Sequence, residues 1–117
     1  MEEIHVINVG KYFDSMKTLD LESAVLQVQE RQGRHIVLNL QDVRMIDSRG
    51  LGKLFLTYHH LHRNHVRVSL INLSPTVREM LEYVNLTQVL PIYESLEDVA
   101  DTQTLGIHFY EQSTTQA

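Results

Sequence analysis

Apolar residues recur along this chain in two alternating patterns, which predict strands and helices in turn. Short runs rich in β-branched residues occupy 4–9, 35–40 and 66–72, and runs of this kind are typical of buried strands. Between them, apolar residues repeat at helical spacing over about 19–31 and 50–64. The expected buried stripes are Leu21, Ala24, Val25 and Val28 in the first helix, and Leu51, Leu54, Phe55, Tyr58 and Leu61 in the second.

The alternation continues after residue 72. Ser74 followed by Pro75 predicts a helix start, because serine caps helices and proline suits their first position. Ser95 is expected to open a final helix in the same way. The third helix is expected to bury Val77, Met80, Leu81 and Val84 and to end near Asn85; the final helix is expected to carry Val99 and Leu105; short strands are expected at 12–13 and 89–93.

This order of elements predicts an α/β fold, with a mostly parallel or mixed β-sheet and helices packed on it. The length of 117 residues is that of one domain, with one core. We expect the domain to span 1–106. The polar segment 107–117 is expected to be a partly disordered C-terminal tail.

Composition excludes several classes of function. The chain has no cysteine, which rules out disulfides, thiolate metal sites and a cysteine nucleophile. Its net charge is -5 and its ten Lys and Arg residues are scattered, so nucleic acid is not an expected partner. No apolar run approaches the roughly 18 residues of a membrane span. The N-terminus Met1-Glu2-Glu3 is acidic where a signal peptide is basic, which indicates a cytoplasmic protein.

The segment 47–52, Asp-Ser-Arg-Gly-Leu-Gly, stands at the predicted start of the second helix. In one interpretation Asp47 or Ser48 caps the helix, Gly50 permits the turn and Gly52 allows close packing. In the other, the Ser48 hydroxyl is exposed and accepts a phosphate, which would meet unpaired backbone N–H groups and the positive end of the helix dipole. The residues alone leave both interpretations open.

This segment resembles the D-S-[S/T]-G-L-G signature of the STAS domain, the fold of bacterial anti-sigma-factor antagonists. As in that family, the segment follows a Val/Leu-rich strand. The likeness continues in order through 36–40, 70–78, 81–86 and 89–95, and covers residues 4 to about 101.

The resemblance implies a non-enzymatic, partner-switching protein that needs no cofactor. Ser48 would be phosphorylated by a cognate serine kinase that is also the anti-sigma factor. The unphosphorylated form would hold that kinase and release the sigma factor, and a PP2C-type phosphatase would restore it. Asp47 would be the neighbour of the acceptor at the loop, and Gly50 and Gly52 would be sites of close backbone approach.

Two residues depart from the family pattern. Arg49 replaces the small Ser or Thr that usually follows the acceptor, and Asn39 stands where many members have Asp. Helix geometry adds one position, because Leu56 falls opposite the buried stripe, beside Lys53 and His60. It is either a partner contact or a single exposed leucine. The predicted partner-binding surface consists of Asp47, Ser48, Arg49, Gly50, Gly52, Lys53 and Leu56.

Other chemistries lack necessary parts. The histidines in 59–65 are expected to solvate a helix end, since a zinc site needs three or four convergent ligands. A hydrolase nucleophile would need a G-x-S-x-G elbow, which Ser48 does not have. Two alternatives remain open beside the antagonist. One is a non-catalytic binding module in a signalling or transport assembly, and the other is a small-ligand-binding domain in which Ser48 is only a cap.

Overall fold

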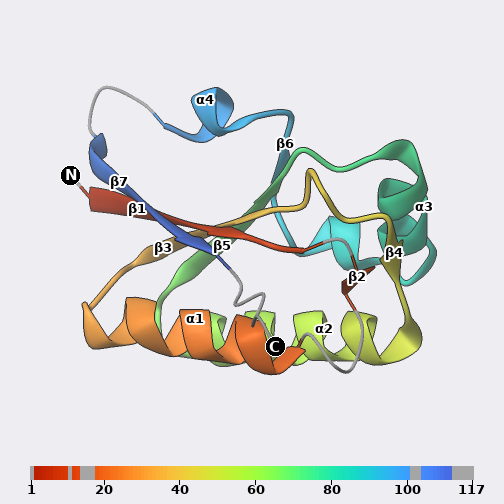
Figure 1. The fold of residues 1–117 in the computed structure, drawn as a ribbon, viewed down its shortest axis with the longest axis horizontal. Coiled ribbons are helices and arrows are strands. Elements are labelled where there is room, and N and C mark those ends of the chain that lie inside the picture. The colour runs from red at the N-terminus through yellow and green to blue at the C-terminus, as the bar shows by residue number, and fades with distance from the viewer. Residues whose placement is uncertain (1, 11, 14–17, 101–103, 112–117) are drawn as a thin grey trace, which may run out of the picture.

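A five-stranded parallel sheet forms the centre of the molecule (Figure 1). The computed structural model describes residues 2–10, 12–13, 18–100 and 104–111. Its strand order is β6-β5-β3-β1-β7, and β2 and β4 form a separate parallel pair. The strands are β1 (Glu2–Asn8), β2 (Tyr12–Phe13), β3 (His35–Asn39), β4 (Met45–Ile46), β5 (Arg67–Ile71), β6 (Ile92–Tyr93) and β7 (Thr104–Glu111).

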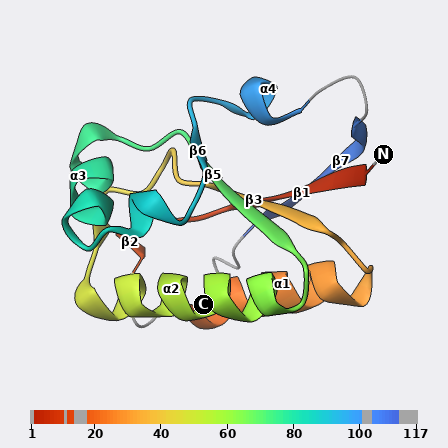
Figure 2. The same cartoon turned by 180° about the vertical axis from the view of Figure 1, so that it is seen from behind.

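Helices cover the two faces of this sheet unequally (Figures 1 and 2). The long helices α1 and α2 lie side by side on one face, and α3 and the 3-10 turn η1 close the end of the same core. The short helix α4 covers part of the other face, over a smaller cluster formed by Ile4, Val6, Val37 and Ile71. The bounds are α1 (Thr18–Glu30), α2 (Ser48–Arg63), α3 (Pro75–Tyr83), η1 (Leu86–Gln88) and α4 (Leu96–Val99).

The predicted α/β class is confirmed, and α1, α2 and α3 start and end within about two residues of their expected limits. The prediction allowed either a mostly parallel or a mixed sheet. In the structure every pair of described strands is parallel. Gly33 follows α1 as predicted. A Cβ there would lie 2.5 Å from Cγ1 of Val28, so this close approach requires glycine.

Two residues of the predicted helical stripes are exposed. The stripe of α1 is buried throughout, but Phe55 in α2 and Val84 after α3 are each 43% exposed. Phe55 lies at the edge of its stripe, where its ring meets the ring of His59 edge-on at 4.4 Å. Val84 is already the C-cap of α3, beyond the last helical turn. The prediction that both are buried was therefore wrong.

The C-terminal third also differs from the prediction. Leu105 was placed in the last helix, but α4 ends at Val99 and Leu105 belongs to β7, which pairs with β1. Exposed Leu105, Ile107 and Phe109 alternate along β7, which is the period of a strand and not of a helix. The expected boundary at 106 thus falls inside β7, and residues 112–117 of the expected tail lie outside the described residues. The expected strand 89–93 is reduced to β6, because η1 and its C-cap Val89 precede it.

A buried histidine joins β7 to the rest of the sheet. His5 is 2% exposed, and its Nδ1 lies 2.9 Å from the hydroxyl of Tyr110. The ring of His108 stacks on His5 at 4.9 Å, and Nε2 of His108 lies 2.7 Å from Oε1 of Glu3. The guanidinium of Arg31 lies over the Tyr110 ring. Burial, and then the neighbouring His108, lower the pKa of His5, while Glu3 opposes this and Arg31 adds to it.

We expect acid to weaken the fold through His5. Since its pKa is lowered in the folded protein, the unfolded chain binds more protons below the ordinary histidine value of about 6.5. The free energy of unfolding should therefore fall as the pH drops below that value. Urea unfolding at about pH 7.5 and pH 5.5 checks this, with His5→Gln as the comparison, because glutamine keeps a polar group but does not titrate. If both proteins lose the same stability between these pH values, His5 is not the cause.

Candidate functional site

Ser48 is exposed at the first position of α2. The residue before it, Asp47, is the N-cap, with extended backbone angles and a side-chain oxygen that accepts a hydrogen bond from the Gly50 N–H at 2.7 Å. Of the two possible caps, Asp47 is therefore the one used. The Ser48 side chain is left on the surface, in the first turn of the helix as predicted.

The loop that carries this helix entry is anchored by the core. It leaves β3 through Leu40, which is 1% exposed, and its later residues Val43 and Ile46 are each 2% exposed. The Val43 N–H donates to the Leu40 carbonyl at 3.1 Å. Because apolar anchors hold the loop at three points, the position of Asp47 and Ser48 follows from the packing of the core.

Three asparagine side chains link the strand ends beneath the site, and sequence reasoning did not identify them as a group. The Asn39 side chain donates to Oδ1 of Asn8 at 2.8 Å and accepts from Nδ2 of Asn72 at 3.0 Å. It also accepts from the Gln41 N–H at 3.1 Å, at the start of the loop. An amide both donates and accepts, whereas a carboxylate only accepts, so this network uses Asn39 as an amide. The available signal was an asparagine at or near the end of each of the three apolar runs 4–9, 35–40 and 66–72.

The remaining predicted site residues occupy different environments. Gly50 is buried, whereas Gly52 is exposed and a Cβ there would meet open space. The interpretation that Gly52 allows close packing within the chain is therefore wrong. Arg49 is exposed and makes no ion pair with any described residue. Lys53 is half-buried and forms an ion pair with Glu22 of α1.

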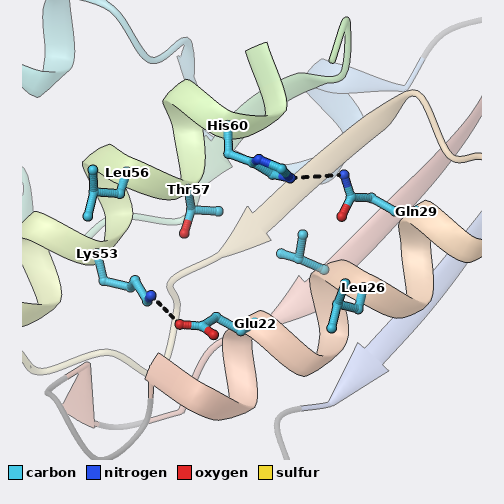
Figure 3. Close-up of a pocket in the computed structure, with 8 residues that line it drawn as sticks. Glu22, Leu26, Gln29, Lys53, Leu56, Thr57 and His60 are labelled. Carbon is cyan, nitrogen blue, oxygen red and sulfur yellow. Dashed lines mark hydrogen bonds and ion pairs between the residues drawn. The ribbon is translucent and has the colours of Figure 1, made fainter. Parts of the chain in front are cut away.

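A groove of about 310 Å³ lies between α1 and α2, and Figure 3 shows the contacts that cross it. The Lys53–Glu22 pair crosses at one point, and the Gln29 side-chain nitrogen lies 3.3 Å from Nε2 of His60 at another. The two contacts are seven residues apart on each helix, which is about two helical turns. The two helices therefore run in the same direction, and their turns stay aligned over this distance. The groove is lined by Glu22, Val25, Leu26, Gln29, Lys53, Leu56, Thr57 and His60.

Two exposed leucines border this groove. Leu56 is 63% exposed and Leu26 is 59% exposed. Leu56 has the exposed position that helix geometry predicted, and Leu26 extends the apolar surface onto α1, which sequence reasoning missed. A prediction made within one helix cannot show which residue of a second helix lies opposite.

The outer face of α2 is basic although the chain is acidic. At about 100° per residue, five residues on this side of the helix fall within a stripe about 80° wide. We call this set the α2 stripe, and it consists of Arg49, Lys53, Leu56, His60 and Arg63. The chain as a whole has a net charge of -5. A surface of this kind favours an acidic partner surface that also presents an apolar side chain.

The histidines of α2 have other contacts. No group of three or more potential metal ligands is found among the described residues. His62 stacks on Tyr58 with ring centroids 5.5 Å apart, and His60 and His62 lie in the last turn of the helix. There a positive charge suits the helix dipole.

Within the described part of the chain, no helix is long and apolar enough to cross a membrane.

Replacing the cap should destabilise the helix entry without altering Ser48. Asp47→Ala removes the acceptor for the Gly50 N–H and should lower the free energy of unfolding by about 1 kcal/mol. Asp47→Ser, which retains a capping oxygen, should lose less. Ser48→Ala is the matched control and should unfold like the wild type within about 0.5 kcal/mol. Urea unfolding measures all three, and a loss in Ser48→Ala that equals or exceeds the loss in Asp47→Ala would show that the Asp47 side chain is not the specific cap.

Comparison with known proteins identifies relatives over most of the chain. It is 31% identical over 68 residues to the anti-sigma F factor antagonist of Paenibacillus polymyxa, a match that spans 58% of each protein. It is 24% identical over 96 residues to the anti-sigma-B factor antagonist of Staphylococcus aureus, covering 82% of this chain and 89% of the relative.

Solved structures share the fold at low sequence identity. A sulfate transporter family protein from Wolinella succinogenes has a TM-score of 0.73 at 16% identity, covering 80% of this chain and 79% of its own. The anti-sigma factor antagonist SpoIIAA in its unphosphorylated form has a TM-score of 0.68 at 21% identity, with 85% and 87% covered. The phosphorylated form of the Bacillus cell fate determinant SpoIIAA has a TM-score of 0.63 at 20% identity, with 85% and 90% covered.

The STAS domain family model matches residues 2–99, which include every described strand and helix except β7. That range contains the Asp47 cap, the exposed Ser48 and the whole of α2. This chain belongs to the STAS domain family.

Proposed function

We propose that this chain is an anti-sigma-factor antagonist whose binding to a cognate anti-sigma factor with serine kinase activity is controlled by phosphorylation of Ser48. The observation that carries the proposal is the exposed Ser48 hydroxyl in the first turn of α2, next to the capping Asp47. The family and the names of the curated relatives support the same role. In this proposal the chain is a cytoplasmic binding protein and performs no catalysis.

The position of Ser48 explains how a phosphate would act. The carboxylate of Asp47 takes the Gly50 N–H, and the first intrahelical bond runs from the Leu51 N–H to the Asp47 carbonyl at 2.9 Å. The amides of Ser48 and Arg49 precede that bond, so the local backbone tolerates an anion. A phosphate would add up to about two negative charges there without disrupting the helix. Its effect would therefore fall on the partner.

The unphosphorylated chain would bind through the α2 stripe and the α1–α2 groove. Arg49 and Lys53 would face acidic residues of the kinase, and Leu56 with Leu26 would receive one of its apolar side chains. Phosphorylated Ser48, one residue before Arg49 at the start of α2, would place negative charge beside this stripe and near that acidic surface. Like charges brought together at an interface oppose binding, so the phosphorylated form would release the kinase. A PP2C-type phosphatase would return the chain to its binding form.

Charge at Ser48 should therefore decide binding. Ser48→Asp should weaken binding to the purified kinase about tenfold or more, whereas Ser48→Ala should bind like the wild type and resist release by ATP. The measurement is calorimetric titration against the serine kinase of the chain's native cells, together with mass spectrometry of the Ser48 peptide after incubation with ATP. Thr76→Asp is the matched control, because Thr76 is an exposed hydroxyl residue in the first turn of α3. Equal affinities for Ser48→Ala and Ser48→Asp would refute the proposal.

Arg49 should speed association with the kinase and have little effect on the fold. Because it is exposed and forms no ion pair with a described residue, Arg49→Ser should unfold like the wild type. At low salt the unphosphorylated variant should associate several-fold more slowly, and the difference should shrink as salt screens the charge. Stopped-flow association rates over a salt series check this. Identical rates at every salt concentration would remove Arg49 from the binding surface.

A further inference from the structure

The strand β7 forms one edge of the sheet and lies outside residues 2–99, the range that the family model matches. Among the described strands it pairs with β1 alone (Figure 1). Its outer edge therefore carries backbone N–H and C=O groups that no described strand pairs. An edge of this kind is a template for a further strand, which makes β7 a candidate interaction surface.

One face of β7 adds exposed apolar side chains to this edge. Leu105 and Phe109 are each 62% exposed, and Ile107 between them is 38% exposed. In the register of the sheet, Ile107 lies beside Ile4. Phe109 lies beside Val6, which belongs with Ile4 to the buried cluster beneath α4. The apolar surface of that cluster thus continues outward to the edge strand, where the described residues leave it uncovered.

The sequence of β7 lacks the features that usually block pairing at an edge. Natural sheets protect their edges with charged side chains, proline, short strands or bulges. β7 has eight residues, and 104–110 contain no Lys, Arg, Asp, Glu or Pro. An irregularity occurs at its start, where Leu105 has no partner residue on β1. From Gly106 onward the pairing with β1 is regular, so this part of the strand is suited to pair on its other side as well.

These features fit a second copy of the same chain. The net charge of -5 makes two copies repel one another, so a contact between them needs a surface without charge, which 104–110 supply. Two identical strands related by a two-fold axis run antiparallel and keep their apolar faces on the same side. The undescribed segments that flank β7, 101–103 and 112–117, contain no large apolar residue and so are not suited to cover its apolar face.

From these features we infer that the chain forms a symmetric homodimer in which the β7 strands of two copies pair antiparallel along their outer edges. Centring the pairing on the regular segment 106–110 places Ile107 of each copy opposite Phe109 of the other. Aromatic and β-branched residues that face one another across an antiparallel pair stabilise it. The resulting apolar strip joins the two clusters beneath the α4 helices of the two copies.

The other face of β7 does not oppose this pairing. His108 lies at the centre of the paired segment, but its ring stacks on His5 and its Nε2 lies 2.7 Å from Oε1 of Glu3. Both contacts are with β1, so the imidazole is directed away from the outer edge. The long helices, with Ser48 at the start of α2, lie on the face of the sheet opposite the apolar strip (Figure 1). The inference is therefore independent of the proposed switch.

Sedimentation velocity of the full chain over a concentration series tests the dimer. A contact confined to one strand from each copy lies near the lower limit of specific interfaces, so we expect a Kd of about 10–100 µM. The wild type should be mostly monomeric at about 2 µM and mostly dimeric at about 500 µM. Amide hydrogen exchange within 104–111 should be slower at the higher concentration, because pairing protects the amides of the outer edge.

Two charge variants test the register. Ile107→Glu and Phe109→Lys should each weaken dimerization about tenfold or more, since each places a charge within the apolar strip. An equimolar mixture should regain the dimer, because the register brings the new carboxylate of one variant against the new ammonium of the other. Tyr83→Lys is the matched control, because Tyr83 is an aromatic residue of α3 that is 90% exposed, and it should dimerize like the wild type.

Urea unfolding at low concentration should give the wild-type midpoint for Phe109→Lys, whose side chain is exposed, so that this variant keeps the test decisive if Ile107→Glu does not fold. A wild type that stays monomeric at about 500 µM would overturn the inference and leave the edge to an extended segment of another protein. A dimer that both charge variants retain would overturn it too, because that dimer would form through another surface. A mixture that does not regain the dimer would refute the pairing of Ile107 with Phe109. Ser48→Asp should dimerize like the wild type, so none of these results bears on kinase binding.

Discussion

The burial of β3 on both of its faces is the constraint on which the arrangement of this molecule depends. Ile36 and Leu38 belong to the main core against the long helices, whereas Val37 belongs to the smaller cluster beneath α4. β3 pairs in parallel with β1 and β5, and parallel neighbours must be joined by crossover connections, which here are helices that also cover the sheet. The chain after β3 must therefore cross over the sheet before it pairs with β3 again as β5, and that crossover contains α2.

The position of the proposed binding surface follows from where that crossover begins. The carboxyl end of β3 is tied through Asn39 to the ends of its neighbours, and the loop after it is pinned by Val43 and Ile46. Asp47 then closes the helix entry with its side chain. Each of these contacts restrains the next, so buried residues hold the exposed Ser48 in one place. A surface site on a rigid support loses little conformational entropy on binding.

The strongly periodic parts of this chain could be predicted from its sequence, and the parts that depend on contacts between elements could not. The stripe of α1 and the position of Ser48 follow from local spacing and capping chemistry. Leu105 was misplaced because a lone apolar residue fits either period, and only pairing with β1 selects the strand. Leu26 was missed for a related reason, since its neighbour Leu56 is thirty residues away and becomes adjacent only when α1 and α2 pack in parallel. The asparagine network likewise requires three strand ends to be aligned.

The two ends of α2 differ in a way that bears on how a switch at Ser48 must work. At the C-terminal end the last carbonyls are occupied, by the His65 and Val66 amides and by the Asn64 side chain, which donates to the His60 carbonyl at 2.7 Å. At the N-terminal end the amides of Ser48 and Arg49 precede the first helical hydrogen bond and carry the positive end of the helix dipole. Negative charge is therefore best tolerated at the end where Ser48 lies.

For the proposed phosphorylation of Ser48, this asymmetry separates the stability of the fold from the control of binding. A phosphate within a strand or at the other end of the helix would oppose the local structure and regulate by partial unfolding. At Ser48 it would meet favourable backbone groups, so the phosphorylated chain would remain folded. The change in affinity must then arise at the interface itself, where the added charge meets the partner and alters the basic face of α2. In the proposed cycle, therefore, neither the phosphorylated nor the unphosphorylated state requires the domain to unfold.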